Sequence, residues 1–255
     1  VYHCAALISF NPKDYSKLLK INREGTANIV NLCLAYHIKK LVYVSSIATI
    51  GKDINSQNVD EESEWTIKDA NAYALTKYEA EMEVWRGSQE ALPVVIFNPG
   101  IIIGPGFWNT GSGLLFKSAS KGYSYYPPSG TGFITVNDVV KLLILGMNSS
   151  VDKERFIAIY ENKSYHEILN NICDGLGIDP PTKKLKFWQL ELLRRLDWLR
   201  SVLTNGDRKI TGNNIKSLRE SKNYSNQKLL NAFDIKFEAL DKAIAFSCQK
   251  FKQRS

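Results

Sequence analysis

The chain has 255 residues, of which 44% are hydrophobic and 23% charged. This mixture is typical of globular domains and excludes collagen-like, disordered and coiled-coil classes, and the length allows one large domain or two smaller ones. The net charge is +7, and the whole basic excess lies after residue 150. The longest purely apolar runs are far shorter than the roughly 20 residues that cross a bilayer.

The cysteines and histidines form no ligand pattern. The four cysteines lack the CxxC and CxxH spacings of metal sites, and we interpret them as reduced thiols of a cytoplasmic protein. A His/Cys metal site would need ligands scattered along the whole chain, so we expect no metal. The chain opens with Val1 in a strand-like run, and we expect that sequence before it is missing.

Runs of β-branched and aromatic residues alternate with helical patterns. Residues 1–4, 41–44 and 94–97 predict buried strands, and residues 14–37 and 72–85 predict helices between them. This alternation predicts a parallel sheet with right-handed crossovers. Segment 104–135 is rich in Gly, Pro, Ser and aromatic residues, which predicts loops around a binding cleft.

Further elements follow in the last 120 residues. We expect Asn137 and Asp138 to cap a helix over 139–147, a strand over 155–160, and Ser164 to cap the helix after it. No phosphate-binding glycine loop is present, because every Gly-x-Gly lacks the third glycine of the GxGxxG pattern. We therefore expect these 255 residues alone to bind a dinucleotide poorly.

Tyr73 and Lys77 are the first candidate catalytic pair. Residues four apart on a helix share one face, and an ammonium beside a phenol lowers the pKa of the phenol from its usual value near 10. The spacing alone is weak evidence, because two other pairs share it. We interpret these as solvent-facing chance pairs: Tyr36 with Lys40, and Tyr224 with Lys228.

The context of Tyr73 and Lys77 is more specific than their spacing. The predicted strand over 41–44 ends in Ser45 and Ser46, and the strand over 94–97 ends in Asn98. Ligands of open α/β sheets bind at the carboxyl edge of the strands. We expect these hydroxyl, phenol and amide groups to converge on one crevice.

Six segments, in this order, make the chain resemble the extended short-chain dehydrogenase/reductase family. They are residues 1–6, 22–28, 45–51, 73–77, 98–106 and 136–140. The resemblance implies a Rossmann-type doubly wound α/β parallel sheet without its N-terminal strands, and a smaller C-terminal α+β substrate domain. It divides the chain at residues 1–103 and 104–255, with the two domains interleaved.

The resemblance also implies roles for individual residues. Tyr73 would be the catalytic acid/base, Lys77 would lower its pKa and hold the nicotinamide ribose, and Ser46 would hydrogen-bond the reacting oxygen, with Ser45 as the fallback. The cofactor would be NAD or NADP. Besides Tyr73 and Lys77, the residues expected to line its site are Ala5, Ala6, Ser45, Asn98, Pro99 and Ile101.

The implied function is an NAD(P)-dependent oxidoreductase that acts on a small carbonyl or secondary alcohol. Ile47 and Ala48 stand where sugar dehydratases of the family carry an acidic pair, which argues against dehydration. A nucleotide-sugar epimerase is the alternative, in which Lys117 and Arg155 would hold a diphosphate. A third hypothesis is a non-catalytic binding or membrane-associated protein that retains the fold. The sequence leaves open whether the protein forms a homodimer.

Two residues outside this group have plainer interpretations. We interpret His3 as a packed strand-end residue. Asn22 is interpreted as structural, with a part in a proton relay as the alternative.

Residues 183–203 predict a basic amphipathic helix. Our first interpretation is a helix packed over the substrate domain with its charges in water, and the alternative is peripheral contact with an anionic membrane. Nucleic-acid binding is not expected, because aromatic residues do not interleave the basic ones. The predicted apolar stripe consists of Leu185, Trp188, Leu192, Leu196, Leu199 and Leu203.

Overall fold

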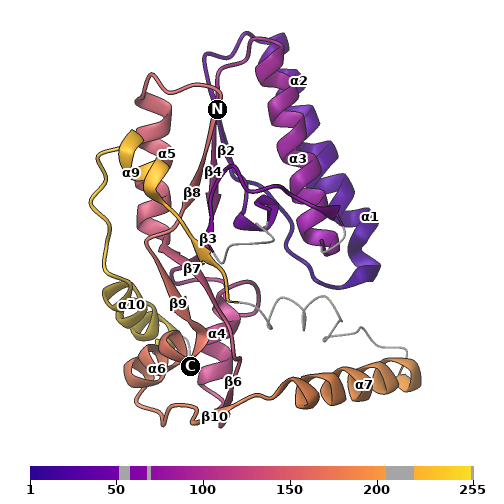
Figure 1. Cartoon of the computed structure of the whole chain (residues 1–255), viewed down its shortest axis with the longest axis vertical. Helices are drawn as coiled ribbons and strands as arrows, with labels where there is room; N and C mark the ends of the chain where they lie inside the picture. Colours follow the sequence, from indigo (N-terminus) through magenta and orange to yellow (C-terminus); the bar gives the residue numbers. More distant parts are fainter. Residues whose placement is uncertain (52–57, 68–69, 205–220, 254–255) are drawn as a thin grey trace. The chain divides into compact units, whose positions relative to one another are not determined.

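The computed structural model describes residues 1–51, 58–67, 70–204 and 221–253 (Figure 1). The chain divides into two compact units, and each unit collects three separate stretches. The first unit contains Val1–Gly100, Asn137–Ile159 and Tyr224–Lys236. The second contains Ile101–Val136, Tyr160–Asn223 and Phe237–Ser255.

A four-stranded parallel sheet forms the centre of the first unit, which confirms the predicted α/β class. Its strand order is β1-β2-β4-β8, and every neighbouring pair is parallel. Apolar residues fill β2 and β4, as expected for strands covered on both faces. The strands are β1 (Tyr2–His3), β2 (Leu41–Val44), β4 (Val94–Pro99) and β8 (Glu154–Ala158).

Helices α2 and α3 pack against each other beside this sheet (Figure 1). Their apolar residues form one buried cluster with β2 and β4, which includes Val30, Val84 and Ile96. The predicted helix over 14–37 is interrupted by a π-helical segment, η2. The elements are η1 (Pro12–Asp14), α1 (Tyr15–Leu18), η2 (Leu19–Glu24), α2 (Gly25–Ala35), η3 (Ile47–Thr49) and α3 (Ala72–Gln89).

Helix α5 (Val136–Asn148) begins earlier than its sequence predicts. The expectation that Asn137 and Asp138 cap it is wrong, because both lie inside its first turn. Asp138 is buried there and forms an ion pair with Lys141, 2.8 Å away. Helix α9 (Gln227–Ala232) and the short pair β3 (Asn58–Val59) with β11 (Asn223–Tyr224) complete this part of the chain.

The second unit contains a three-stranded sheet of order β5-β7-β9 and a short parallel pair, β10-β6. Ser164 caps α6 through a capping box with Glu167, as predicted for this helix start. The strands are β5 (Ile101–Ile103), β6 (Tyr125–Tyr126), β7 (Gly130–Thr135), β9 (Glu161–Ser164) and β10 (Lys183–Lys184). The helices are α4 (Gly113–Ala119), α6 (Tyr165–Leu176), α7 (Phe187–Thr204) and α10 (Leu240–Lys252).

The prediction that segment 104–135 consists of loops is wrong in part. It contains α4, β6 and β7, and three of its aromatic residues, Trp108, Phe116 and Phe133, belong to the core of the second unit. Trp108 and Phe116 pack edge to face with ring centroids 5.3 Å apart. Phe107 is instead 87% exposed. In the described part of the chain, no helix has the length and apolar character that a membrane crossing requires.

Candidate active site at the sheet edge

The carboxyl ends of β1, β2 and β4 lie at one edge of the sheet. The register places His3 beside Tyr43 and Val44 beside Phe97. Because these strands are parallel, the residues that follow them emerge at the same edge. Residues 4–6, 45–46 and 98–99 therefore lie there together, as the sequence predicts.

Tyr73 lies in the first turn of α3, and Asn71 fixes that turn. The Asn71 side chain accepts a hydrogen bond from the Ala74 N–H at 2.8 Å, as a good N-cap residue does. The ring of Tyr73 contacts Phe10 edge to face at 5.9 Å. Burial raises the pKa of the Tyr73 phenol, and a side-chain hydrogen bond with Ser46 acts in the opposite direction.

Lys77 lies one helical turn after Tyr73 and is almost completely buried. Its ammonium donates to the Tyr43 hydroxyl at 2.6 Å and to the Val44 carbonyl at 2.9 Å. Burial lowers the pKa of Lys77 to about 8, and the charge of Glu81 opposes this change.

The expectation that Lys77 lowers the pKa of Tyr73 is not met. The two residues share a helix face, but the two hydrogen bonds of Lys77 go to Tyr43 and Val44. The pKa of Tyr73 is raised because burial disfavours the phenolate. Tyr73 is therefore a protonated phenol at neutral pH.

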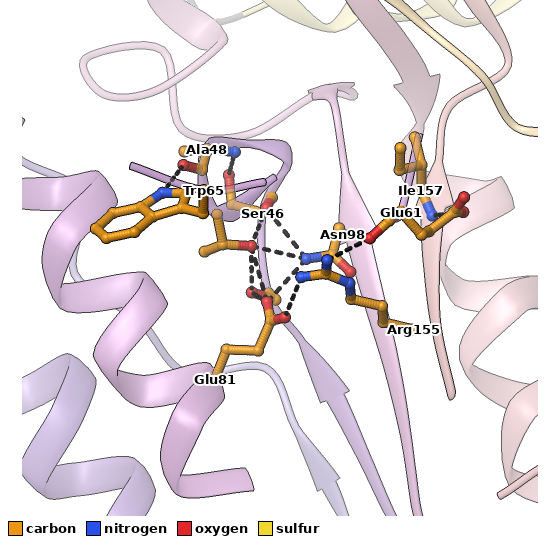
Figure 2. A network of polar contacts seen from close by, with 10 residues as sticks. Ser46, Ala48, Glu61, Trp65, Glu81, Asn98, Arg155 and Ile157 are labelled. Carbon is orange, nitrogen blue, oxygen red and sulfur yellow. Dashed lines mark hydrogen bonds and ion pairs between the residues drawn. The ribbon is translucent and has the colours of Figure 1, made fainter. Parts of the chain in front are cut away.

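A buried carboxylate, Glu81, connects the strand ends (Figure 2). Its Oε2 accepts hydrogen bonds from Ser45 at 2.5 Å, Thr49 at 2.8 Å and Asn98 at 2.8 Å. Its Oε1 lies 3.3 Å from Arg155 Nη1. A buried charge is stable only when it is paired and hydrogen-bonded, and Glu81 has both kinds of partner.

Arg155 is held from a second side by Glu61. Arg155 donates to the Glu61 carbonyl, and the Glu61 carboxylate accepts from the Ile157 N–H at 2.7 Å (Figure 2). The guanidinium thus lies between Glu81 on α3 and the Glu61 carbonyl, two residues after β3. These two contacts occupy part of the guanidinium, and the alternative in which Arg155 holds a diphosphate stays a prediction.

The same network fixes the turn that carries Ser46. The Ser46 carbonyl accepts from Asn98 at 3.3 Å and lies 2.8 Å from the Thr49 hydroxyl, whose single proton it shares with Glu81. The Ser46 hydroxyl oxygen accepts from the Ala48 N–H at 3.2 Å. The hydroxyl proton of Ser46 stays available as a donor beside Tyr73.

Trp65 covers this turn from outside. Its ring stacks on Tyr78 at 3.9 Å, and its indole N–H donates to the Ala48 carbonyl at 3.4 Å. The approach of this segment requires a glycine at position 51, because a Cβ on Gly51 would lie 1.8 Å from the Glu64 carbonyl oxygen.

A second set of hydrogen bonds holds Tyr43, the hydroxyl acceptor of Lys77, in place. Tyr43 is hydrogen-bonded to Thr26 as well as to Lys77. Thr26 donates to the Asn22 carbonyl at 2.6 Å and lies 2.9 Å from His3 Nε2. His3 also stacks on Tyr43, so it is a packed strand-end residue, as interpreted from the sequence.

Asn22 anchors the loop that follows β1. Its side chain accepts from the Leu7 N–H at 2.7 Å and donates to the Leu7 carbonyl at 3.1 Å and to Thr76 at 3.2 Å. These contacts give Asn22 a structural role.

The residues expected to line a cofactor site fall into three groups. Ala5 and Ala6 are exposed after β1. Ser45, Asn98 and Pro99 are buried, and the first two belong to the Glu81 network. Ile101 belongs to the second unit.

The two other tyrosine–lysine pairs with a spacing of four residues lie outside the candidate active site. Tyr36 is 74% exposed, as expected, but Lys40 is bound by backbone carbonyls, including those of Ser149 at 2.6 Å and Val151 at 2.9 Å. The prediction that Tyr224 faces solvent is wrong, because it packs in a buried cluster with Val59 and Ile157. Lys117, the other candidate diphosphate ligand, donates to Asn109 at 2.6 Å.

Sequence reasoning missed Glu81, Thr49 and Tyr43. The spacing could have indicated Glu81, because a residue four positions after Lys77 and eight after Tyr73 lies on the same face of a helix. Tyr43 and Thr49 had no local signal, since their partners lie 34 and 32 residues away. Among the described residues, no group of three His, Cys, Asp or Glu side chains could hold a metal ion.

A comparison with models of protein families shows which family this chain belongs to. A model of NAD-binding proteins with the description "Male sterility protein" matches residues 1–168. The chain belongs to the extended short-chain dehydrogenase/reductase family. This match confirms the predicted membership of that family. The solved structures described below confirm the predicted Rossmann-type fold.

Named relatives of this family resemble the chain over about 70% of its length. A protein of Synechocystis sp., provisionally named dihydroflavonol 4-reductase, is 30% identical over 74% of this chain and 57% of its own. Sterol demethylase protein B of Methylococcus capsulatus is 27% identical over 71% of this chain and 56% of its own. The chain thus spans about half the length of the curated relatives that it matches.

Solved structures of the family share the fold. The crystal structure of gox2253 superposes with a TM-score of 0.83 at 24% identity, over all of this chain and 78% of that one. The UDP-N-acetylglucosamine 4-epimerase of Methanobrevibacter ruminantium gives a TM-score of 0.76 at 16% identity, over 100% and 77% of the two chains. Other neighbours were solved with NAD+ or NADPH.

Proposed function

We propose that the whole protein carrying this chain is an NAD(P)-dependent oxidoreductase that interconverts a carbonyl and a secondary alcohol on a small molecule. The contact between the Tyr73 and Ser46 hydroxyl groups, with Lys77 on the same helix face, carries this proposal. Relatives named as reductases and dehydrogenases support it.

The residues at the sheet edge fit a nicotinamide nucleotide. A lysine ammonium has three N–H groups, and two of those on Lys77 have acceptors among the described residues. The third suits a ribose hydroxyl. The small exposed side chains of Ala5 and Ala6 leave room for a flat ring beside β1. The bound nucleotide would supply or accept the hydride.

Tyr73 and Ser46 then handle the proton. When a carbonyl carbon gains a hydride, its oxygen becomes an alkoxide, and Tyr73 gives that oxygen its phenol proton. The raised pKa of Tyr73 keeps this proton in place at neutral pH. Ser46, whose oxygen already accepts from Ala48, donates its single proton to the developing charge.

A nucleotide-sugar epimerase is the competing function within the same fold. Arg155 already contacts Glu81 and Glu61, which leaves fewer of its N–H groups for a diphosphate. This favours the reductase.

The experiment is a coenzyme balance on the whole protein. We expect incubation with NADH or NADPH and a panel of small ketones and aldehydes to consume reduced nicotinamide in step with alcohol formation. A protein that interconverts sugar epimers without any net change in reduced nicotinamide would contradict the reductase proposal.

A further inference from the structure

Helix α7 carries an apolar stripe that faces away from the protein. Trp188, Leu196 and Leu203 are 62%, 53% and 76% exposed. Leu192 and Leu199 are exposed as well. At 3.6 residues per turn, these five positions fall within about 80° of the helix circumference. They are five of the six residues in the stripe that the sequence predicts.

The buried residues of α7 lie on the side opposite the stripe, although Leu193 and Trp198, outside the stripe, are also 42% and 51% exposed. Leu190 and Asp197 are buried, with 5% and 9% exposure. Both lie more than about 100° away from the stripe. The first interpretation from the sequence, a helix packed over the substrate domain with its charges in water, holds for the charges, but the apolar stripe is not packed against the domain.

Basic residues border the stripe. The side chain of Arg195 is 74% exposed at one edge, and the side chain of Arg200 is 42% exposed at the other. Lys183, Lys184 and Lys186 precede the helix and are exposed too. The two acidic residues of α7 lie outside the stripe: Glu191 pairs with both Arg194 and Arg195, and Asp197 pairs with Arg200, so among the described residues the three lysines carry the unpaired part of the basic border.

We propose that α7 docks the protein onto the surface of an anionic lipid bilayer. A helix with an apolar face that includes tryptophan, bordered by arginine and lysine, lies in the plane of a membrane interface. The basic border complements anionic headgroups. A second copy of the chain is a poorer occupant, because pairing two stripes would bring their arginines together.

The test is vesicle flotation with the purified chain. We expect the chain to float with phosphatidylcholine vesicles that contain phosphatidylserine and to stay behind with phosphatidylcholine alone. High salt is expected to weaken the binding, since it screens exposed charges. A chain that does not float with anionic vesicles overturns the proposal.

Two variants separate the apolar stripe from its basic border. We expect L196E with L199E to reduce the bound fraction at least about tenfold, because two carboxylates would enter the interface. Neutralising the border with K183Q, K184Q and R195Q is expected to reduce binding to anionic vesicles about as strongly. Circular dichroism checks that both variants keep their helices.

The matched control is F246E on α10, where Phe246 is also 50% exposed. It should float like the parent. Equal flotation of the parent and both stripe variants would overturn the proposal. So would a parent that sediments as a dimer, binds no vesicles and becomes monomeric in L196E with L199E, a result that assigns the stripe to a second copy.

Discussion

Glu81 is the residue on which the polar contacts at the sheet edge converge. We expect Glu81→Gln to lower the free energy of unfolding by about 2–3 kcal/mol, since it removes the charge that Arg155 faces. It should also lower kcat more than it raises KM, because Ser46 loses its fixed turn. Denaturant titration and steady-state kinetics measure the two effects.

The control for this change is Glu90→Gln at the end of the same helix. Glu90 pairs with Arg86 at 2.7 Å, but both side chains are well exposed. Exposed pairs contribute little, so this variant should lose less than about 1 kcal/mol and keep its kcat. Equal losses in the two variants would mean that the Glu81 network has no special role.

Lys77 should set the alkaline limit of carbonyl reduction. Its pKa of about 8 lies below that of Tyr73, which burial raises. We therefore expect kcat/KM to fall as pH rises through about 8, when the ammonium that would hold the ribose loses its charge. The pH profile of kcat/KM reports pKa values of the free enzyme.

The control for this assignment is Lys77→Ala. Its kcat/KM should be low throughout and should show no decline near pH 8. A decline at the same pH in this variant would assign the titration to another group.

His3 should make the fold sensitive to mild acid. Burial lowers the pKa of His3 from 6.5 to about 4, and the charge of Lys77 adds to this effect. The unfolded chain therefore binds the proton first, and stability present above pH 6.5 is lost as pH falls towards 4. The loss from this residue is on the order of 3 kcal/mol.

Urea unfolding at several pH values measures this loss. The variant His3→Gln should show a smaller decline between pH 6.5 and 4 than the parent. His37→Gln, which changes an exposed histidine, should decline like the parent. A His3→Gln variant with an unchanged acid decline would contradict the assignment.

At the scale of elements, Gly51 controls how the Trp65 segment covers η3. A methyl group there would meet the Glu64 backbone, so we expect Gly51→Ala to cost about 1–3 kcal/mol. Gly25→Ala is the control, because its nearest neighbour is 3.8 Å away and the position is helical. That variant should be neutral or more stable by up to about 1 kcal/mol. Equal destabilisation would contradict the packing argument.

The elements of the first unit follow from local patterns, whereas their boundaries depend on tertiary contacts. The strand over 41–44 was predicted with its observed ends, because its four apolar or aromatic residues stand between two lysines and two serines. The start of α5 was mispredicted, since Asp138 is stabilised by Lys141 one turn later. A capping signal cannot be distinguished from such a pair in the sequence.

Some residues of the candidate site were predictable from the sequence, whereas the contacts of others were not. Tyr73, Lys77 and Ser46 were predicted from spacing and family order, and the first two share a helix face. Ser45 and Asn98 were expected at a cofactor, which stays a prediction, and the contacts of their donors with Glu81 were not foreseen. Their roles depend on which way buried side chains turn between strands, and no local pattern encodes that direction.

At the scale of the molecule, the two proposals use separate units. The proposed catalytic groups come from β2, η3 and α3 of the first unit, and the exposed stripe lies on α7 of the second. Loss of vesicle binding in L196E with L199E should therefore leave the coenzyme balance of the whole protein unchanged. Loss of both together would show that α7 also serves the reaction.

The central claim is that the phenol proton of Tyr73 accompanies hydride transfer. The direct measurement is kcat of carbonyl reduction in the whole protein with Tyr73→Phe, beside Tyr36→Phe as an exposed control. The claim predicts a fall of about 10²–10⁴ in kcat for Tyr73→Phe, with unchanged folding, and parental kcat for Tyr36→Phe. A folded Tyr73→Phe variant that reduces its substrate at the parental rate would contradict it.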